Sequence, residues 1–107
     1  MREIKETDWR VLSRLHRLAV ERFCERVLTE VESVINNTEG AHQRYLDIFR
    51  IMKRRDREMA QLFNGLKRSQ GLNMLARIRS AELLTEEEFS SLSSETRGVI
   101  QMLLDRD

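Results

Sequence analysis

The chain has 107 residues with no Pro and four Gly, 35% of its residues are charged, and its net charge is +1. This length fits one domain with a real core, and the scarcity of Pro and Gly favours helices over turn-rich strand folds. No apolar run approaches the ~18 residues of a membrane-spanning helix. We therefore expect helices with one solvated side and a core made of apolar stripes.

Two further features favour the cytoplasm. The N-terminal segment MREIKETDW lacks the apolar centre of a signal peptide. The single Cys24 cannot form an internal disulfide, which fits a reducing compartment. We therefore expect a cytoplasmic protein.

The small net charge hides an asymmetry along the chain. Residues 1–79 carry 17 basic and 11 acidic side chains, whereas residues 80–107 carry 2 basic and 7 acidic ones. Arg outnumbers Lys 16 to 3. Arg suits both ion-pair networks at helix interfaces and phosphate contacts, although a G+C-rich genome also favours Arg codons.

An uninterrupted apolar stripe predicts a first helix over residues 8–35, capped by Thr7 or Asp8. The apolar residues follow three- and four-residue spacing from Trp9 to Val34, which is typical of a core-facing stripe. A helix of this length spans about 42 Å. That is longer than a compact domain of this size needs, and it indicates a long hairpin or a dimer seam.

The segment NNTEG, residues 36–40, is the clearest turn, because Asn and Gly tolerate positive φ and end helices. A second helix is predicted over residues 41–64, with Thr38 as its cap. Because the link is so short, the two helices are expected to be antiparallel neighbours. A break or kink is expected at residues 64–71, where two Gly occur.

Three shorter helices are predicted over residues 69–83, 86–92 and 94–104. Thr85 caps the middle one, and Glu88 occupies the reciprocal position of a capping box. One of the two serines that follow this helix begins the last helix.

The second helix contains one local contradiction, within the run of charged residues 53–58. At about 100° per residue, Arg55 and Asp56 point into the apolar stripe while their neighbours point away. Antiparallel pairing brings Arg22 and Arg26 within a turn of Asp56, which predicts a half-buried Arg–Asp pair. Polar groups at such positions cost stability but fix register and partner, so we interpret these four residues as a structural or interface polar layer.

The sequence offers no catalytic set. His16 lies near the centre of the first stripe without a nucleophile or orienting partner that can be named, so a histidine at a helix interface is the favoured interpretation. Cys24 fits a small, partly buried residue better than a reactive thiol. Glu39 and His42 have the Glu-x-x-His spacing of di-metal bundles, but that chemistry needs two such motifs. We expect no enzyme, no cofactor and no metal site.

A basic middle region supports an alternative function. Residues 41–79 carry 10 basic and 3 acidic side chains, and such a surface attracts phosphates. The contacts of a small nucleic-acid-binding regulator would come from five residues: Lys53, Arg54, Arg57, Lys67 and Arg68. Binding to a membrane surface is less favoured, because acidic residues balance the basic ones on the first helix.

Residues 83–89, LLTEEEF, preceded by Leu75 and Ile78, resemble the short helix–turn–helix element called SHOCT, found at the ends of many bacterial proteins. The resemblance covers about fifteen residues of a capped-helix pattern. It departs from that element at Glu82, where Gly is usual, and at Ser93, where this chain breaks a helix that is usually longer. The resemblance implies at most a role in self-association.

The sequence therefore predicts one all-α domain over residues 1–107. Its architecture is an up-and-down helical bundle built on a long antiparallel hairpin of the first two helices, with shorter C-terminal helices packed against it. The predicted function is a non-enzymatic helical protein–protein interaction or regulatory module that self-associates as a homodimer. The wide, long apolar stripes and the polar pair inside one of them motivate this prediction.

Overall fold

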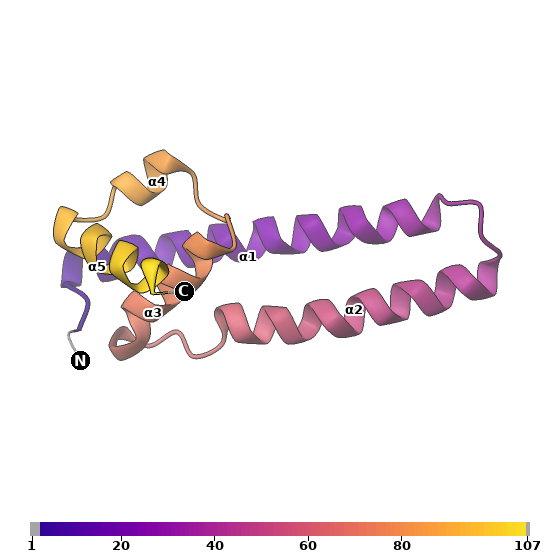
Figure 1. Ribbon diagram of the computed structural model, residues 1–107, viewed down its shortest axis with the longest axis horizontal. Helices are drawn as coiled ribbons and strands as arrows, with labels where there is room; N and C mark the ends of the chain where they lie inside the picture. The colour runs from indigo at the N-terminus through magenta and orange to yellow at the C-terminus, as the bar shows by residue number, and fades with distance from the viewer. Residues whose placement is uncertain (1–2, 107) are drawn as a thin grey trace.

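The computed structural model describes residues 3–106, which fold into five α-helices and one 3₁₀ turn without any strand (Figure 1). In chain order the helices are α1 (Glu6–Ile35), α2 (Ala41–Phe63), η1 (Arg68–Gln70), α3 (Gly71–Ser80), α4 (Glu86–Ser90) and α5 (Ser94–Asp105). The predicted all-α bundle on a long hairpin of α1 and α2 is confirmed.

The hairpin of α1 and α2 turns at residues 36–40, as predicted. The Arg44 guanidinium closes the turn by donating to the carbonyl of Ile35 at 2.7 Å. The predicted capping by Thr38 is wrong, because α2 begins directly after Gly40, and glycine has no side chain that could cap the helix. The first N–H groups of α2 lie at an exposed end of the hairpin.

The chain breaks between α2 and α3, as the sequence predicted. Gly65 adopts a φ of 80°, which favours glycine, just after α2 ends at Phe63. Gly71 then begins α3 against the N-terminal segment: a Cβ there would lie 2.9 Å from a methyl carbon of Ile4. Glycine at this position is therefore a packing requirement, since it lets Ile4 become buried.

Local capping sets the starts of the last two helices. The Thr85 side chain accepts from the Glu88 backbone at 3.1 Å, and the Glu88 carboxylate accepts from the Thr85 backbone at 2.9 Å, so the predicted capping box is confirmed. Ser93 caps α5 by accepting from the Thr96 backbone at 3.3 Å.

The cap predicted for α1 is wrong, and the reason is a contact across the whole chain. The helix begins after Lys5, without a side-chain cap, and Asp8 lies inside it with only 2% of its surface exposed. The Asp8 carboxylate accepts from the Ser93 backbone at 2.9 Å and from the Ser93 and Thr96 hydroxyls at 2.6 Å. Burial raises the pKa of Asp8, but these hydrogen bonds outweigh it, so the pKa is lowered.

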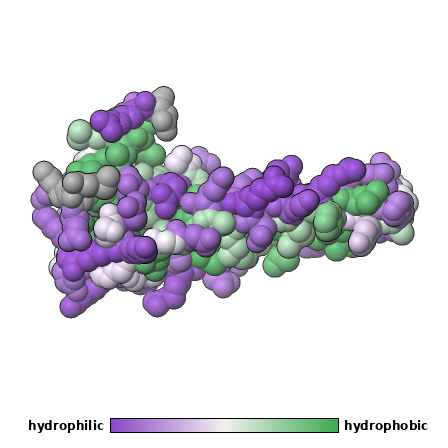
Figure 2. All heavy atoms as spheres, turned by 90° about the horizontal axis from the view of Figure 1, so that it is seen from below, coloured by the Kyte–Doolittle hydropathy of each residue, from purple (hydrophilic) through white to green (hydrophobic). Residues whose placement is uncertain are grey.

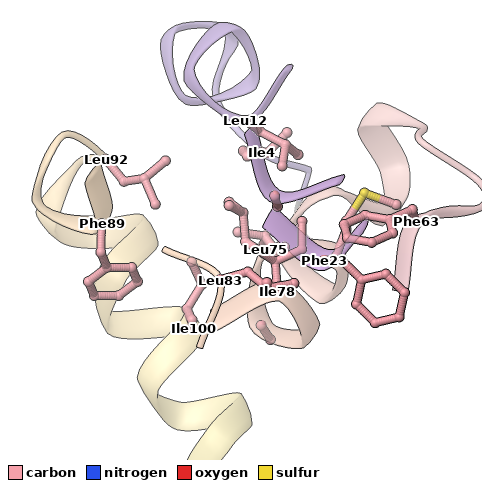
Figure 3. Packing of buried hydrophobic residues seen from close by; sticks show 14 of the residues in the cluster. Ile4, Leu12, Phe23, Phe63, Leu75, Ile78, Leu83, Phe89, Leu92 and Ile100 are labelled. Atoms are coloured by element: carbon pink, nitrogen blue, oxygen red, sulfur yellow. The ribbon is translucent and has the colours of Figure 1, made fainter. Parts of the chain in front are cut away.

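The core lies at one end of the molecule, where α3, α4 and α5 pack on the first half of α1 and the end of α2; we call this region the head (Figure 1). Leu75, Ile78, Leu83 and Ile100 are at most 1% exposed and gather at its centre (Figure 3). The hairpin projects from the head, and we call its residues 28–58 the arm; at the base of the arm, Arg55 and Glu58 line pockets with residues of the head.

The arm makes the molecule elongated. The principal-axis extents are 52 × 25 × 24 Å, and the radius of gyration is 16.6 Å. A compact domain of this length would have a radius of gyration of about 13 Å. The difference means that a large part of the chain is not packed into a common core.

Candidate interaction surface

The arm exposes large apolar side chains that the head does not cover. Between Val27 and Phe63 no side chain is fully buried. Five large apolar residues in this segment are about half exposed or more: Leu28 at 64%, Ile35 at 50%, Tyr45 at 65%, Phe49 at 57% and Met52 at 48%. An apolar surface of this extent is unusual on a small soluble monomer and typical of an interaction site.

These residues lie on one side of the arm. At about 100° per residue, positions spaced four and three apart form a single stripe. On α1 the stripe consists of Cys24, Leu28, Val31 and Ile35, and on α2 it consists of Tyr45, Phe49, Met52, Asp56 and Met59. We call the two stripes together the apolar arm face. Seen from below, apolar atoms run along one side of the arm beside a polar band (Figure 2).

A groove shows that the two stripes form a common surface. It has a volume of about 320 Å³ and runs between α1 and α2. Its lining consists of Phe23, Cys24, Val27, Leu28, Met52, Arg55, Asp56 and Met59. The face is thus concave along its middle, with Asp56 as its acidic member.

The head packs on the opposite side of the hairpin. Glu58 and Leu62 of α2 line a pocket with residues of α3 and α5. On the helical wheel, Glu58 and Asp56 are separated by about 160°, since two residues advance the helix by about 200°. The apolar arm face therefore points away from α3 and remains open to a partner.

Arg55, one of the four residues of the predicted polar layer, pairs with partners that the prediction did not include. The Arg55 guanidinium donates to Glu30 at 2.9 Å across the hairpin and to Glu58 at 2.8 Å along α2. These hydrogen bonds, led by the one to Glu30, raise the pKa of Arg55. Asp56 is exposed on the apolar arm face, and the structure does not bring Arg22 or Arg26 to it.

Arg22 and Arg26 bind the head, not α2, which corrects the pairing expected from the hairpin alone. The Arg22 guanidinium forms two parallel bonds with the Glu88 carboxylate at 2.6 and 2.8 Å and donates to the Leu83 carbonyl at 2.9 Å. This bond to Arg22 is the main cause that lowers the pKa of Glu88 from 4.5 to about 2.

Arg26 lies one turn further along α1, and its side chain binds the C-terminal end of α3. Its guanidinium donates to the carbonyl of Ala81 at 2.8 Å and to that of Glu82 at 2.5 Å. Unpaired carbonyls at a helix end favour a cation. No local pattern in the sequence predicts these contacts of the two arginines, because their partners lie 55 to 66 residues away.

The candidate nucleic-acid contacts are only partly available. The Arg54 guanidinium pairs with Glu30 at 3.1 Å, and that of Arg68 pairs with Glu6 at 2.7 Å. Lys53 lies over the ring of Phe49, with its Nζ 5.7 Å from the ring centre. The two other members, Arg57 and Lys67, are exposed, so the basic residues do not form one continuous free surface.

His16 and Cys24, the two side chains considered for chemistry from the sequence, both lie where α1 meets α2. The His16 Nε2 lies 3.2 Å from the Phe63 carbonyl, and the imidazole packs edge-on against the Phe63 ring at 5.4 Å. His16 thus joins the end of α2 to α1. Cys24 is a half-buried free thiol in the groove. Residues 3–106 contain no group of three or more His, Cys, Asp or Glu that is placed to hold a metal ion.

No family model matches the chain, and neither a curated protein nor a solved structure is significantly similar to it. The resemblance to the SHOCT element therefore receives no support from a family match. Within the described residues, no helix has the length and apolar character needed to cross a membrane.

Proposed function

We propose that this chain is a non-enzymatic helical interaction module that self-associates through the apolar arm face, as a homodimer in the cytoplasm. The observation that carries the proposal is the set of five large apolar side chains exposed on the arm. A reducing compartment agrees with the single free thiol of Cys24.

The size of the apolar arm face suits a specific contact. Fully burying one large apolar side chain contributes about 1.5–3 kcal/mol, so a half-exposed one contributes roughly 1 kcal/mol when it is covered. Ten such side chains, five from each copy, contribute on the order of 10 kcal/mol. This is comparable with the estimated cost of association, about 4–15 kcal/mol, so covering the face on both copies is of the size needed to offset that cost.

The polar groups of the arm supply specificity. Asp56 lies inside the apolar arm face and must find a polar partner when the face is covered. A polar residue in such a seam selects one register and disfavours others. This supports a specific partner surface over non-specific hydrophobic sticking.

The test measures molar mass by light scattering after size exclusion, for the wild type, Phe49→Asp and Met102→Asp. Met102 is 71% exposed on α5 and lies outside the arm, so it is the matched control. We expect a dimer for the wild type and Met102→Asp and a monomer of unchanged helicity for Phe49→Asp. A strictly monomeric wild type at high concentration would overturn the proposal, as would a fully dimeric Phe49→Asp.

Nucleic-acid binding is the second candidate, because Lys53, Arg57 and Lys67 are exposed and none of them forms an ion pair within residues 3–106. It is tested by titrating mixed-sequence duplexes at about 50 mM and 200 mM salt, where a phosphate-driven binder weakens steeply. Absence of binding at the lower salt excludes it.

A further inference from the structure

We infer that two copies pack arm to arm with both heads at the same end, so that α1 of each copy lies along α2 of the other. The four arm helices then form an antiparallel bundle. This inference rests on the self-association proposed above and adds the identity and orientation of the partner: a second copy of this chain, selected by charge.

The outer edges of the apolar arm face carry opposite charges on the two helices. On α1, next to the apolar stripe, lie Glu21, Glu25 and Glu32. On α2, Lys53 and Arg57 lie on the corresponding side of the stripe, and Arg50 lies further round the helix, where it pairs with Asp47 at 3.5 Å. All six are exposed, and in residues 3–106 none of the three glutamates forms an ion pair. The arm therefore presents one acidic and one basic edge beside a common apolar face.

The hairpin register brings these charges to matching heights. Contacts across the hairpin join Arg44 to Ile35 and Arg54 to Glu30. A residue of α1 and a residue of α2 at the same height along the hairpin therefore have residue numbers that add up to about 79–84. At that register Glu25 is level with Arg57, and Glu32 is level with Arg50.

Two symmetric face-to-face arrangements exist, and charge distinguishes them. A two-fold axis along the arm lays α1 on the partner's α2 and preserves height, so Glu25 meets the partner's Arg57 and Glu32 meets the partner's Arg50. A two-fold axis across the arm lays α1 on α1 of the partner and α2 on α2 of the partner. In this second arrangement, glutamate edges face glutamate edges. Like charges in register disfavour the second arrangement.

Steric access agrees with the first arrangement. The head packs on the side of the hairpin marked by Glu58 and Leu62, away from the apolar arm face. Two copies joined through this face therefore carry their heads on the outside of the bundle. The heads lie at one end without occupying the space between the arms.

The orientation is measured by pulsed dipolar spectroscopy on a spin label at Thr7→Cys in a Cys24→Ala background. Thr7 is exposed and lies 22 residues, or about 33 Å along α1, from the middle of the α1 stripe of the apolar arm face, near residue 29. Heads at the same end predict a label–label distance below about 40 Å, whereas heads at opposite ends predict more than about 60 Å. The longer distance overturns the inference and leaves self-association intact. A monomer with no dipolar signal overturns both.

Charge reversal gives an independent test by the dimer dissociation constant at low salt. Glu25→Lys with Glu32→Lys should weaken the dimer about tenfold or more, because four cross-copy contacts become repulsive. Adding Arg50→Glu and Arg57→Glu should restore it, because the edges are complementary again. The second arrangement, with the two-fold axis across the arm, predicts no effect of Glu25→Lys with Glu32→Lys on the dissociation constant. That result would show that the inference is wrong.

Discussion

The head and the arm are built from the same two helices, yet they end in opposite states. In the head, α1 directs Leu15, Ala19 and Phe23 into a core closed by α3 and α5. In the arm, the same helix continues the same spacing through Leu28 and Ile35, and nothing in the described chain covers them. Helical periodicity therefore predicts which face of a helix is apolar and favours burial. It does not predict which other element packs on that face.

Their polar groups differ in the same way. The head satisfies its half-buried and buried charges internally, through Asp8 with Ser93 and through Arg22 with Glu88. In the arm, Asp56 lies on an open apolar face and the outer glutamates face solvent. The head thus pairs its buried charged groups within one chain. The arm instead leaves large apolar side chains and charged groups exposed, as the surfaces that bind protein partners do.

The largest effect should come from the core of the head. Leu75→Ala removes a side chain that is 0% exposed and should lower the free energy of unfolding by about 3 kcal/mol. Phe49→Ala, on the arm, should lower it by less than about 1 kcal/mol, because Phe49 is already 57% exposed. Urea denaturation at a concentration where the chain is monomeric measures both. Equal losses would remove the distinction between head and arm.

The next effect concerns the ion pair that fastens α4 to α1. Because the folded pKa of Glu88 is lowered from 4.5 to about 2, its contribution is fully present above pH 4.5 and is lost as the pH falls toward 2. Glu88→Gln should cost on the order of 2 kcal/mol at neutral pH, a figure reduced for the partial exposure of Arg22.

The matched control is Glu86→Gln on the same helix, since the Glu86 side chain is 83% exposed in its pair with Arg79. It should cost less than about 0.5 kcal/mol. Urea denaturation from pH 7 to pH 2 separates the two variants. A wild type whose stability does not fall between pH 4.5 and 2 relative to Glu88→Gln would contradict the role of this pair.

A smaller effect is expected in the arm from Asp56→Leu. Removing a carboxylate from the apolar arm face should tighten self-association by about 1 kcal/mol and reduce its selectivity for one register. Sedimentation equilibrium measures the dissociation constant and any larger oligomer. Asp56→Asn is the control of similar shape. Unchanged association in Asp56→Leu would place Asp56 outside the interface.

The smallest effect is in the connection from α3 to α4. Glu82 adopts a φ of 58°, a conformation that favours glycine. Glu82→Gly should therefore raise the free energy of unfolding by up to about 1 kcal/mol, without touching the arm. Ser80→Gly, at the last residue of α3, should instead lower it by less than about 1 kcal/mol. Thermal unfolding of the two variants checks the sign, and a destabilised Glu82→Gly would contradict the argument.

Local features of the sequence predicted most of the fold. The capping box of Thr85 with Glu88, the turn before α2 and the break near Gly65 all depend on neighbouring residues, so the helices lie close to their predicted bounds. Three residues whose roles were misassigned, Asp8, Arg22 and Arg26, have partners far away in the sequence. Asp8 caps nothing in its own helix, because Ser93, 85 residues away, binds it.

The predicted polar layer failed in detail for the same reason. The hairpin register placed Arg22 near the level of Asp56, but it did not include residues 81–88, the end of α3 through α4, which lie on the other side of α1. That segment offers a carboxylate and free carbonyls, which bind Arg22 and Arg26. Helical periodicity contains no information about such a third element.

The central claim is that a second copy covers the arm while the head stands alone. Amide hydrogen exchange, followed by mass spectrometry at low and high protein concentration, tests it directly. We expect protection of residues 28–35 and 41–58 to rise with concentration in step with the dimer fraction, while protection of α3 stays constant. Arm protection that is independent of concentration across the monomer–dimer range would contradict the claim.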